Sequence, residues 1–124
     1  MRLLAGFQGL YYLLTGLWPV IDLDSFQAVT GGKTDLWLVK TVGLLIAVIG
    51  AAIFRARHRP ALFPEILILA AGSALALGTV DVLYSLLGVI SKVYLLDAPV
   101  EAALVAGWSV IWARQRSATT SPPR

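Results

Sequence analysis

The sequence predicts an all-α integral membrane protein: an antiparallel bundle of four helices that each cross a lipid bilayer. Three observations predict this fold. Of the 124 residues, 58% are hydrophobic, and the mean hydropathy of +0.80 exceeds that of ordinary soluble domains. The apolar residues form four runs, each near the roughly 20 residues that a helix needs to cross a hydrocarbon core of about 30 Å. Charged residues and prolines gather between these runs.

The first expected span covers residues 3–21. No small-x-small cleavage pattern follows it, so we expect it to remain attached as a helix rather than to act as a signal peptide. The next segment, 22–34, is polar and rich in turn-forming residues. Asp24 or Ser25 could cap a short interfacial helix there, and Gly31 is expected to end it.

The second expected span covers residues 35–54 and contains one charged residue within its apolar run, Lys40. A basic hinge at 55–64 follows, and its two prolines cannot continue the helix. The third span is expected at 65–90. Because it is longer than a bilayer requires, it should tilt or extend beyond the hydrocarbon core.

The fourth expected span covers residues 98–113, with Pro99 placed for a helix start. Residues 1–113 therefore form a single transmembrane domain. The segment 114–124 contains serine, threonine, proline and arginine and is predicted to be a disordered cytoplasmic tail.

The distribution of basic residues predicts the orientation of the four spans. One side of the membrane receives Lys33 and Lys92, and the other receives every arginine in the chain. Those arginines are Arg2, Arg55, Arg57, Arg59, Arg114, Arg116 and Arg124. By the positive-inside rule the arginine side is cytoplasmic, so both termini are expected inside.

Small residues recur at four-residue and seven-residue spacing in the expected spans. Such residues stack on one helix face and let neighbouring helices approach closely in lipid. The clearest sets are Gly9 and Gly16; Gly43, Ala47 and Gly50; Ala70, Ala74 and Gly78; and Ala98, Ala102 and Ala106. They predict a compact bundle.

The residue inventory argues against most enzyme and metal chemistry. The chain has no cysteine, and its single histidine, His58, lies in a basic loop without a second imidazole. No Ser-His-Asp set or phosphate-binding loop is present, so we assign no catalytic, cofactor-binding or metal-ligating residue. The positive charge is confined to segments between apolar runs, which indicates membrane orientation rather than nucleic-acid binding.

Three ionisable residues, Lys40, Asp81 and Glu101, fall inside the expected spans at similar depth. Asp81 lies about 24 Å along its helix from the inner end, and the other two lie about 6 to 8 Å below the outer surface. We therefore predict a buried polar network in which Lys40 pairs with Asp81 near Glu101. Tyr84 and Ser85 share the Asp81 side of that helix and are included in the network.

Simpler readings of these charges remain open. Lys40 could extend to the outer headgroups, and Glu101 could simply stabilise the first turn of its helix. Asp81 is the hardest to explain in this way, because its short side chain cannot reach far.

Several stretches of the chain resemble a family of short, uncharacterised bacterial inner-membrane proteins with four helices. The resemblance rests on residues 11–19, 25–31, 33–41, 81–84 and 94–101. In size and helix count the chain is more distantly similar to DoxX-like proteins. This resemblance implies a membrane location and supplies no catalytic residues.

Two functional hypotheses follow, and an enzyme is the least supported class. The leading one is a structural or partner-binding membrane component that contacts membrane lipids and a protein partner or further copies of itself. The alternative is a small transporter or binder of a lipid, a quinone or an amphipathic solute, in which a buried acid takes up a proton or faces a cation.

Overall fold

The structure is a computed structural model that describes residues 1–120 and 122, and the described part contains helices and no strand. Five α-helices and two short 3₁₀ helices follow one another along the chain. Their bounds are α1 Arg2–Ile21, α2 Leu23–Thr30, α3 Leu36–Ala56, η1 Pro60–Leu62, α4 Phe63–Leu86, η2 Lys92–Leu96 and α5 Ala98–Thr120. Among the described residues, α1, α3, α4 with η1, and α5 with η2 are long and apolar enough to cross a membrane. The prediction of an all-α chain with four potential spans is confirmed.

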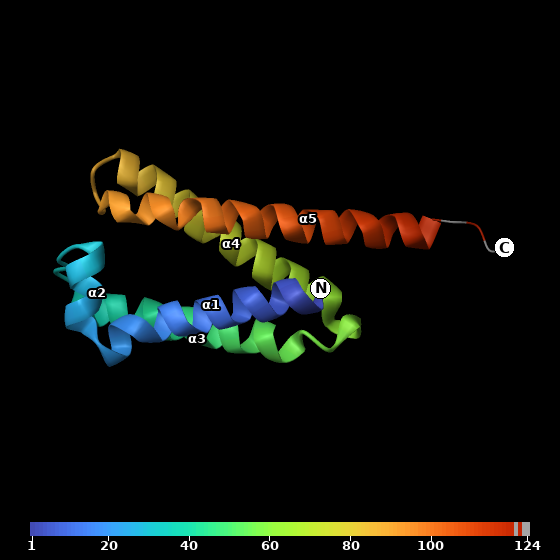
Figure 1. Cartoon of the computed structure of the whole chain (residues 1–124), viewed down its shortest axis with the longest axis horizontal. Coiled ribbons are helices and arrows are strands. Elements are labelled where there is room, and N and C mark those ends of the chain that lie inside the picture. The colour runs from blue at the N-terminus through green and yellow to red at the C-terminus, as the bar shows by residue number, and fades with distance from the viewer. Residues whose placement is uncertain (121, 123–124) are drawn as a thin grey trace.

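The long helices form two antiparallel hairpins, α1 with α3 and α4 with α5 (Figure 1). The hairpins meet where α3 touches α4 and where α1 touches α5. The short helix α2 and the α4–α5 turn lie at one end of the molecule, whereas the start of α1, the α3–α4 turn and the end of α5 lie toward the other (Figure 1). Consecutive spans are therefore neighbours.

Glycines bring α1 and α3 into backbone contact. A Cβ atom added to Gly16 would lie 2.5 Å from the carbonyl oxygen of Gly43, and one added to Gly9 would lie 2.7 Å from that of Gly50. No side chain larger than hydrogen fits at these positions unless the helices separate. The spacing of small residues that the sequence shows is thus used at this interface, which depends on close van der Waals packing.

The capping residue of the short helix α2 lies two residues before Asp24 and three before Ser25, the two caps expected from the sequence. The Asp22 side chain accepts a hydrogen bond from the Ser25 backbone N–H at 3.2 Å, so Asp22 is the capping residue. The prediction of Asp24 or Ser25 was wrong because Asp22 also ends α1 and is shared by both helices. Gly31 follows α2 with a φ of +93°, a left-handed conformation that glycine adopts without strain.

The helix α4 is shorter than the predicted span 65–90, because it ends at Leu86. Gly88 adopts a φ of +74°, and the N–H of Val89 bonds back to the carbonyl of Tyr84 at 2.9 Å. This glycine turn stops the helix although the residues around it are apolar.

The helix α5 runs beyond the predicted fourth span and continues to Thr120. The prediction of a disordered tail is therefore not met over 114–120, and residues 121, 123 and 124 lie outside the described part. Hydroxyl groups support the extra turns: Ser117 donates to the Ala113 carbonyl at 3.1 Å, and Thr119 donates to the Arg116 carbonyl at 2.8 Å. Bonds of this kind satisfy a serine or threonine inside a helix without breaking it.

Candidate functional site

The most unusual feature of the interior is a group of carboxyl and phenol side chains where α1, α4 and α5 meet. We call it the acid–tyrosine cluster and define it as Tyr11, Tyr12, Asp81, Asp97 and Glu101. The tyrosines come from α1, Asp81 from α4, and Glu101 from α5, while Asp97 directly precedes α5. The Glu101 N–H bonds to the Asp97 carbonyl at 3.0 Å, so the first turn of α5 sets these two acids one above the other.

Each tyrosine donates its hydroxyl to one of the acids on the α5 side. Tyr12 Oη donates to Glu101 Oε2 at 2.6 Å, and both side chains are almost completely buried. Tyr11 Oη donates to Asp97 Oδ1. These bonds join the α1–α3 hairpin to the α4–α5 hairpin through polar groups.

Asp81 completes the cluster from α4 and is 5% exposed. Its carboxyl lies near the carboxyls of Asp97 and Glu101, close enough for the three acids to interact electrostatically. Two buried oxygens of the cluster, Asp81 Oδ2 and Glu101 Oε1, have no hydrogen-bond partner among the described residues. Three acidic groups thus meet, and two of them are incompletely satisfied.

No cation compensates these acids in the part of the chain that the structure describes. The charges that act on Asp81 come from Asp97 and Glu101, and the charge that acts on Glu101 comes from Asp97. Among the described residues no ion pair joins Lys40 to Asp81, and the Lys40 side chain is exposed. The register of the α1–α3 hairpin accounts for this, because α3 meets Tyr12 at Gly50 and Lys40 lies about 15 Å before Gly50 along α3.

The other residues expected in the network divide between the interior and the surface. Ser85 is fully buried, and its hydroxyl donates to the Ser91 carbonyl at 3.2 Å, which closes the turn after α4. Tyr84 is 41% exposed. Asp97, which the sequence places in the outer flank, and the two tyrosines are the members that the predicted network lacked.

A second buried polar contact lies one helical turn along α1 from Tyr12. Gln8 donates through Nε2 to the Ala70 carbonyl of α4 at 2.8 Å and accepts from Trp108 Nε1 of α5 at 2.6 Å. Gln8 and Trp108 are fully buried. Because the polar side-chain atoms of this contact are hydrogen-bonded to one another or to the backbone, it links three helices and is not a binding site.

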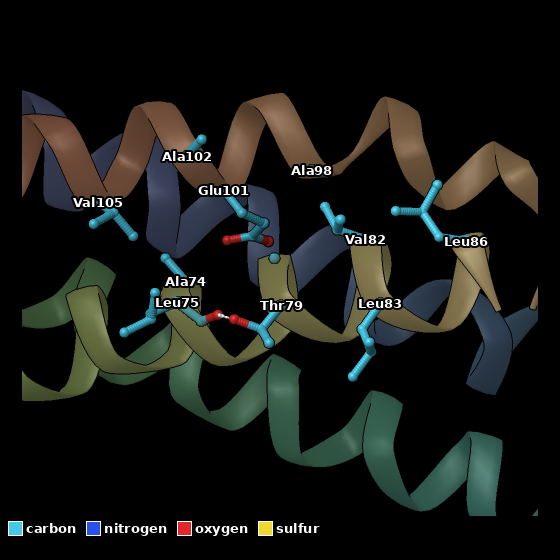
Figure 2. A pocket seen from close by; sticks show the side chains of 11 residues that line it. Ala74, Leu75, Thr79, Val82, Leu83, Leu86, Ala98, Glu101, Ala102 and Val105 are labelled. Atoms are coloured by element: carbon cyan, nitrogen blue, oxygen red, sulfur yellow. Dashed lines mark hydrogen bonds between the residues drawn. The ribbon is translucent and has the colours of Figure 1, made fainter.

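An open groove of about 450 Å³ runs between α4 and α5 beside the cluster (Figure 2). Its walls are mostly Ala, Leu and Val side chains, and Glu101 is the ionisable residue among those that line it. Figure 2 shows the Glu101 carboxyl between the two helices. Gly78 lies opposite, where an added Cβ would be only 3.1 Å from Glu101 Cβ, so the glycine lets α4 pack closely against Glu101.

The described residues contain no group of three His, Cys, Asp or Glu side chains arranged to hold a metal ion. Comparison with known proteins finds no match: no family model, curated protein or solved structure is similar to this chain. The resemblance to short bacterial inner-membrane proteins and to DoxX-like proteins therefore stays a prediction.

Proposed function

We propose that this chain is a small multi-pass protein of the bacterial inner membrane that binds or carries an amphipathic solute. In this proposal its four spans form an antiparallel bundle with both termini in the cytoplasm. The acid–tyrosine cluster is the ionisable centre, and the groove between α4 and α5 receives the solute.

The observation that carries the proposal is the uncompensated acid in the cluster. Burying an ionised carboxylate in an apolar medium without a partner costs many kcal/mol, so such a group binds a proton or a cation. Asp81 Oδ2 and Glu101 Oε1 are both buried and both without a hydrogen-bond partner. If the cluster only held the helices together, amide side chains would do so equally well. The buried Gln8 amide links α1 to α4 and α5 in this way.

The place of Glu101 supports a solute rather than a proton alone. It is hydrogen-bonded to Tyr12 on one side and lines the α4–α5 groove on the other. In a bilayer this groove would open toward the lipid, so an apolar molecule could enter without crossing water. Intramembrane acids commonly mark substrate or proton pathways for this reason.

A structural or partner-binding role is the second candidate. The bonds of Tyr11 and Tyr12 to Asp97 and Glu101 favour it, because they join the two hairpins as the Gln8 contact does. In that case the acids would serve as hydrogen-bond acceptors, and replacing Glu101 by glutamine would leave the properties of the protein unchanged.

A ligand panel distinguishes the two candidates. The unfolding midpoint of the purified protein in detergent would be measured with dodecylamine, a short-chain quinone and a lysophospholipid, each at increasing concentration. We expect one class to raise the midpoint of the wild type, since binding to the folded state stabilises it. Glu101→Gln should abolish that rise because it removes the ionisable group while keeping an acceptor for Tyr12.

The matched control is Glu65→Gln, which changes an exposed glutamate at the start of α4. It should leave the ligand response intact. Infrared spectra across the pH range should also show a carboxyl band from buried acids that changes with pH. Glu101→Gln should reduce this band, and Glu65→Gln should leave it unchanged. The solute proposal fails if no ligand class shifts the midpoint or if Glu101→Gln responds like the wild type.

A further inference from the structure

The position of Glu101 along the α4–α5 groove limits the kind of molecule that fits. On α5 the groove extends from Ala98, three residues before Glu101, to Val105, four residues after it. At a rise of 1.5 Å per residue, apolar wall continues for roughly one helical turn on each side of the acid. The charged group of a ligand at Glu101 would therefore have apolar surroundings in both directions.

We infer that the groove binds a lipophilic cation whose positive charge lies between apolar groups, with that charge against Glu101. This inference rests on the proposed function and names its solute class. A molecule with a charged headgroup at one end fits less well, because its charge would reach the middle of the groove only if its headgroup lay among apolar side chains.

Charge complementarity selects the sign of the ligand. Glu101 Oε2 accepts a hydrogen bond from Tyr12, while Oε1 is buried and has no hydrogen-bond partner among the described residues, so Oε1 is the oxygen that a ligand cation would contact. Asp81 and Asp97 add negative charge next to it. An anion would meet only repulsion at this place, and a neutral molecule would leave the acid unpaired.

The approach to Glu101 lies on the Ala102 side of the groove. At Gly78 the two helices pack tightly, since a Cβ added there would lie 3.1 Å from Glu101 Cβ. Ala102, the next residue of the α5 wall, is small and exposed at the groove surface. In this inference a cation enters past Ala102, and the Glu101 carboxyl, whose residue is 1% exposed, turns toward the groove to meet it.

The test uses two probes of the same size and opposite charge, tetraphenylphosphonium and tetraphenylborate. Binding to the full chain in lipid nanodiscs would be measured by equilibrium dialysis, with empty nanodiscs subtracted. We expect saturable binding of the phosphonium and none of the borate above the empty-nanodisc level. Glu101→Gln should weaken phosphonium binding by about tenfold or more, a change that corresponds to loss of one charge contact.

Two alanines of α5 provide a matched pair that does not alter the acids. Ala102→Phe should fill the groove and weaken phosphonium binding by a similar factor, whereas Ala106→Phe should not, because Ala106 is exposed one turn away and does not line the groove. Both changes replace an exposed alanine, so both variants should fold alike, and circular dichroism would check this.

The outcomes separate this inference from the proposed function. Equal binding of both probes, or equal effects of the two alanine variants, overturns the inference. If the phosphonium does not bind while another solute class still raises the unfolding midpoint in a way that depends on Glu101, the inference fails and the proposed function stands. If neither response depends on Glu101, both fail.

Discussion

Tyr12 has a central place among the residues of the cluster, because it supplies the one hydrogen bond that Glu101 receives through its side chain. It is 1% exposed and belongs to a different hairpin from the acid it serves. Removing its hydroxyl would leave both Glu101 oxygens without a donor while leaving the ring, and hence most of the packing, in place.

We expect Tyr12→Phe to lower the free energy of unfolding by about 1 to 3 kcal/mol, the range for losing a bond to an ionisable group. The measurement is unfolding in a mixed detergent, followed by tryptophan fluorescence. Tyr84→Phe is the matched control, since Tyr84 is exposed on α4. In a Glu101→Leu background the cost of Tyr12→Phe should shrink, because the acid it satisfies is gone. An undiminished cost there would contradict a direct Tyr12–Glu101 contact.

Asp81 and Glu101 could be picked out from the sequence, because a charge inside an apolar run is conspicuous and its depth can be counted from the helix ends. Their partners could not be identified in the same way. Tyr11 and Tyr12 are amphipathic residues that are equally common at a membrane interface. Whether they face an acid depends on how two hairpins pack, which no local pattern specifies.

The α1–α3 hairpin depends on glycine at the element scale. Gly9 and Gly16 of α1 face Gly50 and Gly43 of α3, and the two backbones touch at both levels. In lipid there is little hydrophobic gain from helix association, so this close van der Waals packing has to supply the attraction. A single methyl group at the contact therefore matters more than it would on a lipid-facing surface.

We expect Gly16→Ala to destabilise the hairpin by about 1 to 3 kcal/mol, the usual cost of overpacking. Its Cβ would lie 2.5 Å from the Gly43 carbonyl and 2.6 Å from the Ala47 nitrogen, both backbone atoms that cannot move aside. Gly72→Ala is the control, because nothing lies within 4 Å of its added Cβ. Resistance to unfolding in dodecyl sulfate would compare the two, and equal resistance would show that α1 and α3 do not pack through Gly16.

The existence of the four long helices could be predicted, because hydropathy over about 20 residues is a strong signal. Their ends were harder to predict. The turn at Gly88 is surrounded by apolar residues, so a hydropathy run continues through it. The end of α5 shows the opposite error: residues 114–120 are polar enough to resemble a tail, yet their hydroxyls bond back to the helix.

At the scale of the whole molecule, the arginines of the described residues gather at one end. The start of α1, the turn between α3 and α4, and the far part of α5 lie toward the same end (Figure 1). Desolvation and the nearby charges of Arg57 and Arg2 lower the pKa of His58. The turn between α3 and α4, which contains His58, therefore lies close to Arg2 at the start of α1. The orientation signal comes from the arginines.

We expect both termini of the chain to lie in the cytoplasm. Reporter fusions after residues 30, 60, 95 and 124 should read outside, inside, outside and inside, because the inner membrane retains arginine-rich segments on the cytoplasmic side. Arg55, Arg57 and Arg59 are three of the seven arginines and lie in the connection between the second and third spans, while Lys33 and Lys92 are alone on their side. Replacing these three arginines by glutamine should therefore produce a mixed signal from the fusion at 60, whereas the same replacement at Arg114 and Arg116 should change it less. An external reading of the unmodified fusion at 60 would reverse the assignment and place the acid–tyrosine cluster in the cytoplasmic half of the membrane.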